Sequence, residues 1–380
     1  VLSMTSRERF MTAIRNQEPD CVPVCPDISN MIPCRLTGKP FWDVYVHHDP
    51  PLWRAYLDAV HYFGFDGWVN YGGVTWQRKT PIEHEQKITH TADDRVVVSH
   101  RWRTPAGDLT EEVTYYRADP GTHTRKMIKS LDEDFPKIRC FFEEPTGYDD
   151  SLFREIRRAT GEKGIACLGV GTPGFQDYFW FFDGGLEAVT YAYFDHPEII
   201  EELRQLEHRL YVKQTEMLCE IAPDCICTGG SGSITMQSPP IWREQALPTL
   251  KETTRIAKQA GVLTMVHSCG KERELVKACV EETDLDCVNP LEIPPMGDCD
   301  LAELKRSFGD RISLMGNLHT TEVMLRGTPD DVERAAKKAI DDAAEGGGFI
   351  LSTGDQCGRD TPDENIFRMV GVARTYGCYD

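Results

Sequence analysis

The sequence has no apolar run that approaches the roughly 18 to 20 consecutive residues of a membrane span. Its first residues, Val1-Leu2-Ser3, begin no apolar signal region, so we expect a cytoplasmic protein. Positive charge is scarce, because 42 Lys and Arg stand against 61 Asp and Glu, for a formal net charge of −19. An acidic surface repels phosphate backbones and anionic lipids. Nucleic acids and membranes are therefore not expected partners.

The 14 cysteines lack the compact spacing of a secreted disulfide framework. Several lie inside apolar segments, among them Cys167, Cys225 and Cys227. We expect reduced thiols in a reducing cytoplasm, which suits an anaerobic setting. Tight Cys-x-x-Cys pairs are also missing, which argues against a structural zinc site with four cysteine ligands. No fixed repeat or low-complexity tract is present.

Eight short apolar segments alternate with helical patterns. The segments cover residues 21–25, 66–71, 165–170, 224–227, 262–267, 286–289, 311–315 and 349–352. The helical patterns cover residues 5–14, 196–219, 241–259, 271–282, 301–308 and 329–345. Near-continuously apolar strands that alternate with helices are typical of a parallel (β/α)8 barrel. The sequence therefore predicts an α/β protein with one barrel domain over residues 1–380.

One segment departs from this alternation, from about residue 85 to residue 118. Residues 95–104 and 109–116 alternate in polarity on either side of a turn at Pro105-Ala106-Gly107-Asp108. This pattern predicts an antiparallel β-hairpin inserted after the second barrel strand. The hairpin either caps one side of the barrel mouth or decorates the surface.

Three residues with soft metal-binding atoms follow the ends of predicted strands. His267 and Cys269 end the fifth segment, Gly270 permits a turn there, and Cys357 follows the eighth segment. Active sites of such barrels lie at the carboxyl ends of the strands, so these residues share one rim. One imidazole and two thiolates suit a zinc ion with an open fourth position, although His267 and Cys269 could equally pack in the core. Glu292, after the sixth segment, either fills the fourth position or faces water.

Other side chains near the strand ends are candidates for substrate contact. These are Asp27, Asn30, Tyr71, Tyr178, Asn317 and His319. Tyr178 belongs to the aromatic cluster 175–182, which either packs in the core or forms a pocket wall for an aromatic ligand. His319 either donates to a substrate oxygen or is structural. Cys225 and Cys227 point to one side of a strand and are interpreted as core packing.

The chain resembles the uroporphyrinogen decarboxylase superfamily and, within it, the zinc-containing corrinoid methyltransferase branch. The segments that carry the resemblance are Ser6-Arg7-Glu8-Arg9, residues 19–24, His267-Ser268-Cys269-Gly270, Gly316-Asn317-Leu318 and Thr353-Gly354-Asp355-Gln356-Cys357. The resemblance implies that His267, Cys269 and Cys357 bind zinc, with Glu292 as the ligand that substrate replaces. It also implies a corrinoid carried by a separate protein that docks over the carboxyl face of the barrel.

The resemblance leaves several reactions open. The hairpin around Thr104-Pro105-Ala106-Gly107 is similar to that of members that demethylate methoxylated aromatics, which favours methyl transfer from such an ether to cobalt. A methylcobamide:thiol methyltransferase of the same branch is the alternative. A metal-free decarboxylase is disfavoured, because residues 26–33 contain no arginine to bind the propionate groups of a tetrapyrrole. A zinc-stabilised binding protein without turnover is a further alternative.

Overall fold

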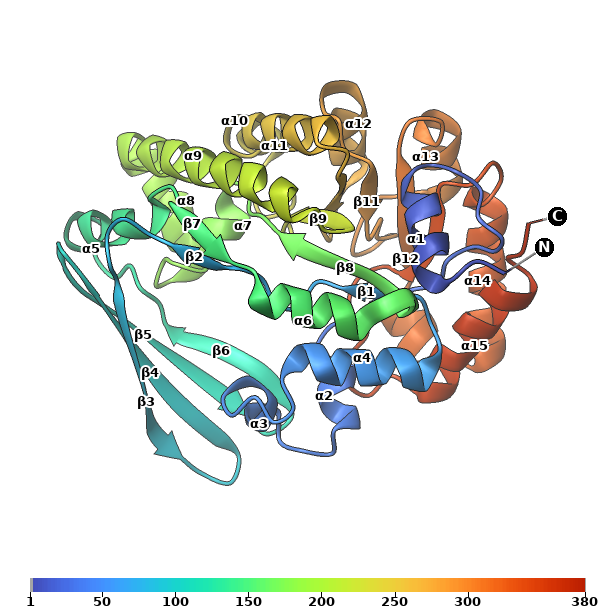
Figure 1. Ribbon diagram of the computed structural model, residues 1–380, viewed down its shortest axis with the longest axis horizontal. Helices are drawn as coiled ribbons and strands as arrows, with labels where there is room; N and C mark the ends of the chain where they lie inside the picture. Colours follow the sequence, from blue (N-terminus) through green and yellow to red (C-terminus); the bar gives the residue numbers. More distant parts are fainter. Residues whose placement is uncertain (1–2, 380) are drawn as a thin grey trace.

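A computed structural model describes residues 3–379, and its centre is a curled parallel sheet of seven strands (Figure 1). The strand order is β1-β8-β9-β10-β11-β12-β13. These strands are β1 (Gly67–Val69), β8 (Gly164–Gly169), β9 (Cys225–Gly229), β10 (Leu263–His267), β11 (Cys287–Asn289), β12 (Ser313–Leu318) and β13 (Phe349–Thr353). All seven were predicted, because each is a buried, nearly continuous apolar run.

The first predicted strand, residues 21–25, forms no regular strand but occupies the eighth position of the barrel. Val24 makes an isolated parallel bridge to Leu351 of β13, and the Cys25 amide donates to the Leu351 carbonyl at 2.9 Å. On the other side, the amide of Asp66, next to β1, donates to the Val24 carbonyl at 2.8 Å. Pro23 has no N–H group to donate to a neighbouring strand, so this segment forms isolated bridges instead of a regular strand. The chain therefore closes a TIM-barrel-like α/β fold.

Helices surround the sheet (Figure 1). They are α1 (Ser6–Ile14), α2 (Met31–Leu36), α3 (Phe41–Tyr45), α4 (Leu52–Phe63), α5 (Leu131–Ile138), α6 (Ser151–Thr160), α7 (Phe175–Tyr178), α8 (Gly185–Asp195), α9 (Pro197–Ile221), α10 (Pro239–Gln245), α11 (Leu247–Gln259), α12 (Arg273–Glu282), α13 (Leu301–Phe308), α14 (Pro329–Ala343) and α15 (Asp363–Thr375). The predicted helix 241–259 is divided into α10 and α11, since Pro248 starts a new helix. No helix among residues 3–379 combines the length and apolarity needed to cross a membrane.

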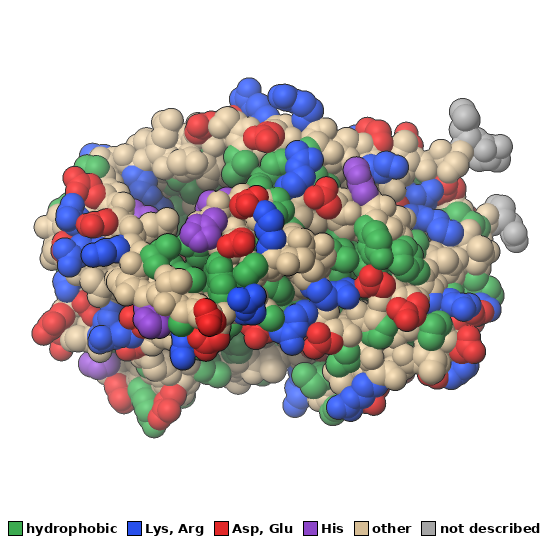
Figure 2. Space-filling view, turned by 90° about the horizontal axis from the view of Figure 1, so that it is seen from below, with side chains coloured by type: hydrophobic (Ala, Val, Ile, Leu, Met, Phe, Trp, Pro, Cys, Tyr) green, Lys and Arg blue, Asp and Glu red, His purple; other side chains and the backbone are tan. Residues whose placement is uncertain are grey.

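The predicted hairpin is the centre of a larger antiparallel sheet. Its strands are β3 (Glu83–Thr91), β4 (Arg95–Thr104), β5 (Gly107–Tyr116) and β6 (Asp119–Arg125), in the order β3-β4-β5-β6. Val98, Leu109 and Val113 are buried on one of its faces. In the view from below, histidines gather toward the side where this sheet lies (Figure 2).

The inserted sheet contacts the loop that follows β13. Arg359 donates from Nη1 to the carbonyl oxygen of Ala118 at 2.5 Å and forms an ion pair with Asp119 at 3.2 Å. Both partners lie at the turn between β5 and β6. Because Cys357 lies two residues before Arg359, the sheet flanks the barrel at the site described below. This contact supports the cap interpretation of the insertion.

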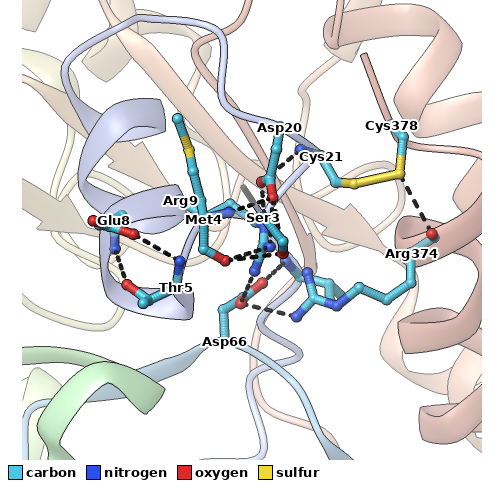
Figure 3. Close-up of polar contacts among 11 residues, drawn as sticks. Ser3, Met4, Thr5, Glu8, Arg9, Asp20, Cys21, Asp66, Arg374 and Cys378 are labelled. Carbon is cyan, nitrogen blue, oxygen red and sulfur yellow. Dashed lines mark hydrogen bonds and ion pairs between the residues drawn. A yellow bond between two sulfur atoms is a disulfide. The ribbon is translucent and has the colours of Figure 1, made fainter. Parts of the chain in front are cut away.

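Residues near the beginning and the end of the described chain, among them Cys21 and Cys378, meet beside the barrel (Figure 3). Cys21 and Cys378 form a disulfide, so the expectation that all cysteines are reduced is wrong for this pair. Arg9 forms ion pairs with Asp20 at 2.7 Å and with the fully buried Asp66 at 3.0 Å, and Arg374 reaches Asp66 at 2.8 Å. This network fixes α1 and α15 against the barrel segment that precedes β1. The disulfide escaped prediction because its cysteines are separated by 357 positions.

Candidate metal centre and substrate pocket

His267, the last residue of β10, is oriented by Asn289, the last residue of β11. The two residues are paired in the sheet, and His267 Nδ1 lies 2.7 Å from Asn289 Oδ1. An amide oxygen can only accept, so Nδ1 carries a proton, and in the neutral ring Nε2 is the nitrogen with the free lone pair. Nε2 faces Asp355, whose Oδ1 lies 3.7 Å away. Asn289 therefore presents His267 in the tautomer that a metal ion requires.

Cys269 lies beside His267 because the chain turns sharply after β10. Gly270 has a φ of +98°, and a Cβ atom there would lie 2.3 Å from Thr235 Oγ1, so glycine is required. The donor atoms of His267, Cys269 and Asp355 all lie within 4.8 Å of one another. We call these three residues the rim group. Burial, followed by the Asp355 carboxylate, raises the pKa of the Cys269 thiol to about 12.

Glu292 contacts the same turn. Its Oε2 accepts a hydrogen bond from the Gly270 amide at 2.5 Å, and burial raises its pKa. The loop that carries Glu292 is held by the fully buried Glu272, which accepts from the amides of Leu291 at 2.6 Å and Glu292 at 3.3 Å. Glu292 thus lies against the turn that follows Cys269, and its role as a fourth ligand stays a prediction.

Cys357 lies next to the rim group without joining it. Its thiol is fully buried, burial raises its pKa to about 12, and its amide donates to the Asp27 carbonyl at 2.7 Å. Asp355, two residues earlier, has a positive φ of +102° and lies beside His267 instead. Asp355 was not among the predicted site residues, because a backbone conformation of this kind leaves no pattern in the sequence.

The donor set fits a zinc ion. Zn–N bonds of about 2.0–2.1 Å and Zn–S bonds of about 2.3 Å place tetrahedral ligand atoms roughly 3.4–3.8 Å apart. The donor atoms of His267, Cys269 and Asp355 lie within 4.8 Å of one another, and Cys357, outside this group, would have to turn toward it to serve as a ligand. Zinc binds imidazole and thiolate ligands more favourably than magnesium or calcium does.

A cavity of about 250 Å³ adjoins His267. Its walls are Pro26, Asp27, Ser29, Asn30, Tyr56, Trp68, Asn70, Tyr71, Ser231, His267, Asp355 and Gln356. Three of the predicted substrate residues, Asp27, Asn30 and Tyr71, are among them. The rings of Tyr56 and Tyr71 pack with centroids 4.7 Å apart. Tyr56 and Trp68, which the sequence analysis missed, complete an aromatic wall. A larger groove of about 690 Å³ lies between α14 and α15, away from the strand ends.

The other three candidates have structural partners. Tyr178 is fully buried and donates to Gln245 Oε1 at 3.1 Å within a separate aromatic core. Asn317 donates from Nδ2 to the Leu291 carbonyl at 2.9 Å and so supports the Glu292 loop. His319 Nδ1 accepts from the amides of Thr321 and Glu322 and caps the short helix that follows it. None of the three lines the 250 Å³ cavity.

A second group of metal-binding atoms lies deeper in the barrel. Cys167, Cys225 and Cys227 are buried and bring their sulfur atoms within 4.8 Å of one another. We call them the thiol cluster. Trp68 Nε1 donates to Cys227 Sγ at 3.3 Å, which connects the cluster to the cavity wall. The sequence analysis interpreted Cys225 and Cys227 as core packing.

Known proteins resemble this chain in sequence and in fold. A methylcobamide:CoM methyltransferase of Methanosarcina mazei is 31% identical over 137 residues, which cover 36% of this chain and 37% of that protein. A uroporphyrinogen decarboxylase of Chlorobaculum parvum is 24% identical over 206 residues, which cover 52% of this chain and 55% of that protein. The chain thus spans about a third to a half of the length of these curated relatives.

The fold comparison covers more of the chain. A solved methyltransferase from Methanosarcina mazei superposes with a TM-score of 0.65 at 16% identity, over 98% of this chain and 99% of that chain. The family described as uroporphyrinogen decarboxylase (URO-D) matches residues 184–376, just over half of the chain. Those residues contain β9 to β13 and the strand ends that carry His267, Cys269, Glu292 and Cys357. The chain belongs to the uroporphyrinogen decarboxylase family.

Proposed function

We propose that the protein is a zinc-dependent methyltransferase that moves a methyl group from a methoxylated aromatic compound to the cobalt of a corrinoid protein. One observation carries the proposal: the rim group lies at the carboxyl ends of the barrel strands and opens into a cavity with aromatic walls. The match to methylcobamide:CoM methyltransferases supports the use of a corrinoid.

We assign His267, Cys269 and Cys357 as the zinc ligands, with Glu292 as the ligand that substrate replaces. When bound, zinc supplies Lewis acidity for the oxygen that leaves. Asn289 holds the His267 ring, and Glu272 holds the loop of Glu292. Tyr56, Trp68 and Tyr71 provide apolar surface for the substrate ring and restrict the water around it.

In this reaction the bond between the ether oxygen and the methyl carbon breaks, and its electron pair stays on the aryl oxygen. The methyl carbon would form its new bond with an electron pair supplied by the cobalt of the reduced corrinoid, which goes from Co(I) to Co(III), on the side opposite the leaving oxygen. The cavity opens at the strand ends, so the corrinoid protein has to dock over that face of the barrel. The inserted sheet borders this face through Arg359 and Ala118.

Methyl transfer to a thiol is the second candidate, because the named activity of several relatives uses coenzyme M. The metal-free decarboxylase is disfavoured, because residues 26–33, four of which line the cavity, contain no arginine to bind the carboxylates of a tetrapyrrole. The cavity has a volume of about 250 Å³, which is smaller than the roughly 300–1,000 Å³ of sites for drug-sized ligands. This size favours a small substrate.

The test is a spectroscopic screen with zinc-loaded protein and a reduced corrinoid protein. Phenyl methyl ethers, methylamines and methylated thiols are each added, and the absorption of methylcobalt is followed. We expect methylcobalt with the ethers. Methylcobalt with the methylated thiols alone favours the thiol enzyme, and no spectral change with any donor contradicts both assignments.

A further inference from the structure

We propose that the thiol cluster is a binding site for trivalent arsenic, which enters as arsenite and is held by the sulfur atoms of Cys167, Cys225 and Cys227. The inference is independent of the proposed function, because it concerns residues outside the assigned zinc ligands. The ligand class is a thiophilic element that forms three bonds to sulfur and carries no net charge when it is bound.

The sheet places the three sulfur atoms on one side of two neighbouring strands. Cys167 of β8 lies opposite Cys225 of β9, and Cys227 follows Cys225 by two residues, so the three side chains point the same way. They belong to the core inside the barrel, whereas Leu168 and Ile226, which alternate with them, pack in a separate core. The sulfur atoms lie within 4.8 Å of one another. The cluster therefore offers three sulfurs to a single atom.

Trivalent arsenic suits this arrangement better than zinc does. Arsenic(III) forms three bonds in a pyramid and keeps a lone pair at the apex, so it needs no fourth ligand. Zinc takes four ligands in a structural site, and the cluster holds three metal-binding atoms among the described residues 3–379. The polar atom that contacts the cluster, Trp68 Nε1, is a hydrogen-bond donor and cannot bind a metal.

The charge of the bound state favours the same element. Three thiolates and one arsenic(III) centre are neutral together, whereas three thiolates leave one negative charge with zinc(II) and two with copper(I). A buried net charge is costly unless it is compensated. Cys167 and Cys225 are 2% and 0% exposed, and the nearby Arg7 is already paired with Asp224 at 2.5 Å. A neutral complex is therefore the one that this position can hold.

The binding step is a ligand exchange without electron transfer. Arsenite is As(OH)3, which is uncharged at neutral pH. Each of its three As–O bonds is replaced by an As–S bond, and each hydroxide leaves as water with the proton of one thiol. Three waters are released, arsenic and sulfur keep their oxidation states, and no further reactant is needed.

Cys227 connects the cluster to the cavity beside His267. Cys227 is 8% exposed, and Trp68, which lines that cavity, donates to its sulfur at 3.3 Å. Cys225 is fully buried behind it. A small uncharged molecule that enters the cavity therefore meets Cys227 first, and the bonds to Cys225 and Cys167 follow.

The test is native mass spectrometry of protein incubated with zinc and then with sodium arsenite, under a phosphine reductant that contains no thiol. We expect one arsenic atom per chain, with the loss of three hydrogen atoms, and an unchanged zinc content. Loss of only two hydrogens, displacement of zinc or absence of binding would each contradict the proposal.

X-ray absorption at the arsenic edge identifies the bound atoms. We expect three sulfur neighbours and no oxygen neighbour, because all three hydroxides have left. An oxygen neighbour would show that the three cysteines do not act together, and this result would also contradict the proposal.

Two variants locate the arsenic. Cys225→Ala should weaken arsenite binding by at least about 100-fold in a calorimetric titration, because one of three linked bonds is lost. Cys279→Ala, which removes an equally buried thiol from α12, is the matched control and should bind arsenite like the unmodified protein. Circular dichroism establishes that each variant is folded. If Cys225→Ala fails to fold, Cys167→Ser decides, and unchanged affinity in the folded cluster variant overturns the proposal.

Discussion

The rim group and the thiol cluster both bring three metal-binding atoms within 4.8 Å, yet they differ in position and chemistry. The thiol cluster lies inside the barrel, where burial raises the pKa of Cys167, and hydrogen bonds from Cys167 and Cys225 lower the pKa of Cys227. The rim group lies at the strand ends, is partly exposed and combines nitrogen, sulfur and oxygen. A metal site needs access and compensated charge in addition to short distances, so we expect the ion at the rim group rather than in the thiol cluster.

The largest expected effect is loss of a rim ligand. Cys269→Ser should remove most of the bound zinc and slow methylcobalt formation by at least about 1,000-fold, since even the partners that orient ligands contribute about 10–100-fold. Metal analysis and the methylcobalt assay measure both quantities. Full zinc content and full activity in this variant would show that the metal binds elsewhere than at the rim group.

The zinc affinity should also depend steeply on pH. In the metal-free protein the pKa values of Cys269 and Cys357 are both raised to about 12, so both thiols are protonated at neutral pH. Zinc binding then releases two protons, and affinity should rise by up to about 100-fold per pH unit between about pH 6 and 8. Competition with a chromophoric chelator measures the slope. A slope near 1,000-fold indicates three thiols, and a flat profile contradicts thiolate ligation.

A smaller effect is expected at Asn289, which orients His267. Asn289→Ala should lower zinc affinity by about 10–100-fold, because the imidazole loses the partner that fixes its tautomer. Asn289→Asp keeps an acceptor at that position and should retain most of the affinity. Identical affinities for the Ala variant and the unmodified protein would show that the contact with His267 has no role in metal binding.

The smallest effect on the metal is expected in the thiol cluster. Cys225→Ala should leave zinc affinity unchanged to within about twofold and should lower the free energy of unfolding by about 1–2 kcal/mol, because a buried sulfur is replaced by a small cavity. Urea denaturation and metal analysis test the two statements. Loss of zinc in this variant would make the thiol cluster the metal site.

Much of the barrel could be predicted because parallel strands bury both faces and leave nearly continuous apolar runs. The same regularity made His267 and Cys269 candidates, since they lie at the end of such a run and just after it. The inserted sheet was underestimated because β3 is exposed along its whole length and carries no apolar alternation. The disulfide between Cys21 and Cys378 joins residues that only the closed barrel brings together.

The directions in which the side chains of the site point could not be predicted from the sequence. Asp355 and Cys357 follow the same strand, and the positive φ of Asp355 determines which of them faces His267. Tyr178 follows β8, like a pocket residue, but the aromatic core buries its ring. Tyr56 lies in the middle of α4, where an aromatic residue is expected to pack in the core. In the structure, Tyr56 also lines the cavity.

Zinc X-ray absorption on the purified protein distinguishes the rim from the thiol cluster, because it counts the sulfur atoms around the metal. We expect two sulfurs at about 2.3 Å, from Cys269 and Cys357, and nitrogen or oxygen ligands at about 2.0–2.2 Å, with the multiple scattering of one imidazole. Three sulfurs without imidazole would place the metal in the thiol cluster and contradict a zinc site at the rim. A single sulfur would instead make Asp355 the third ligand and contradict the assignment of Cys357.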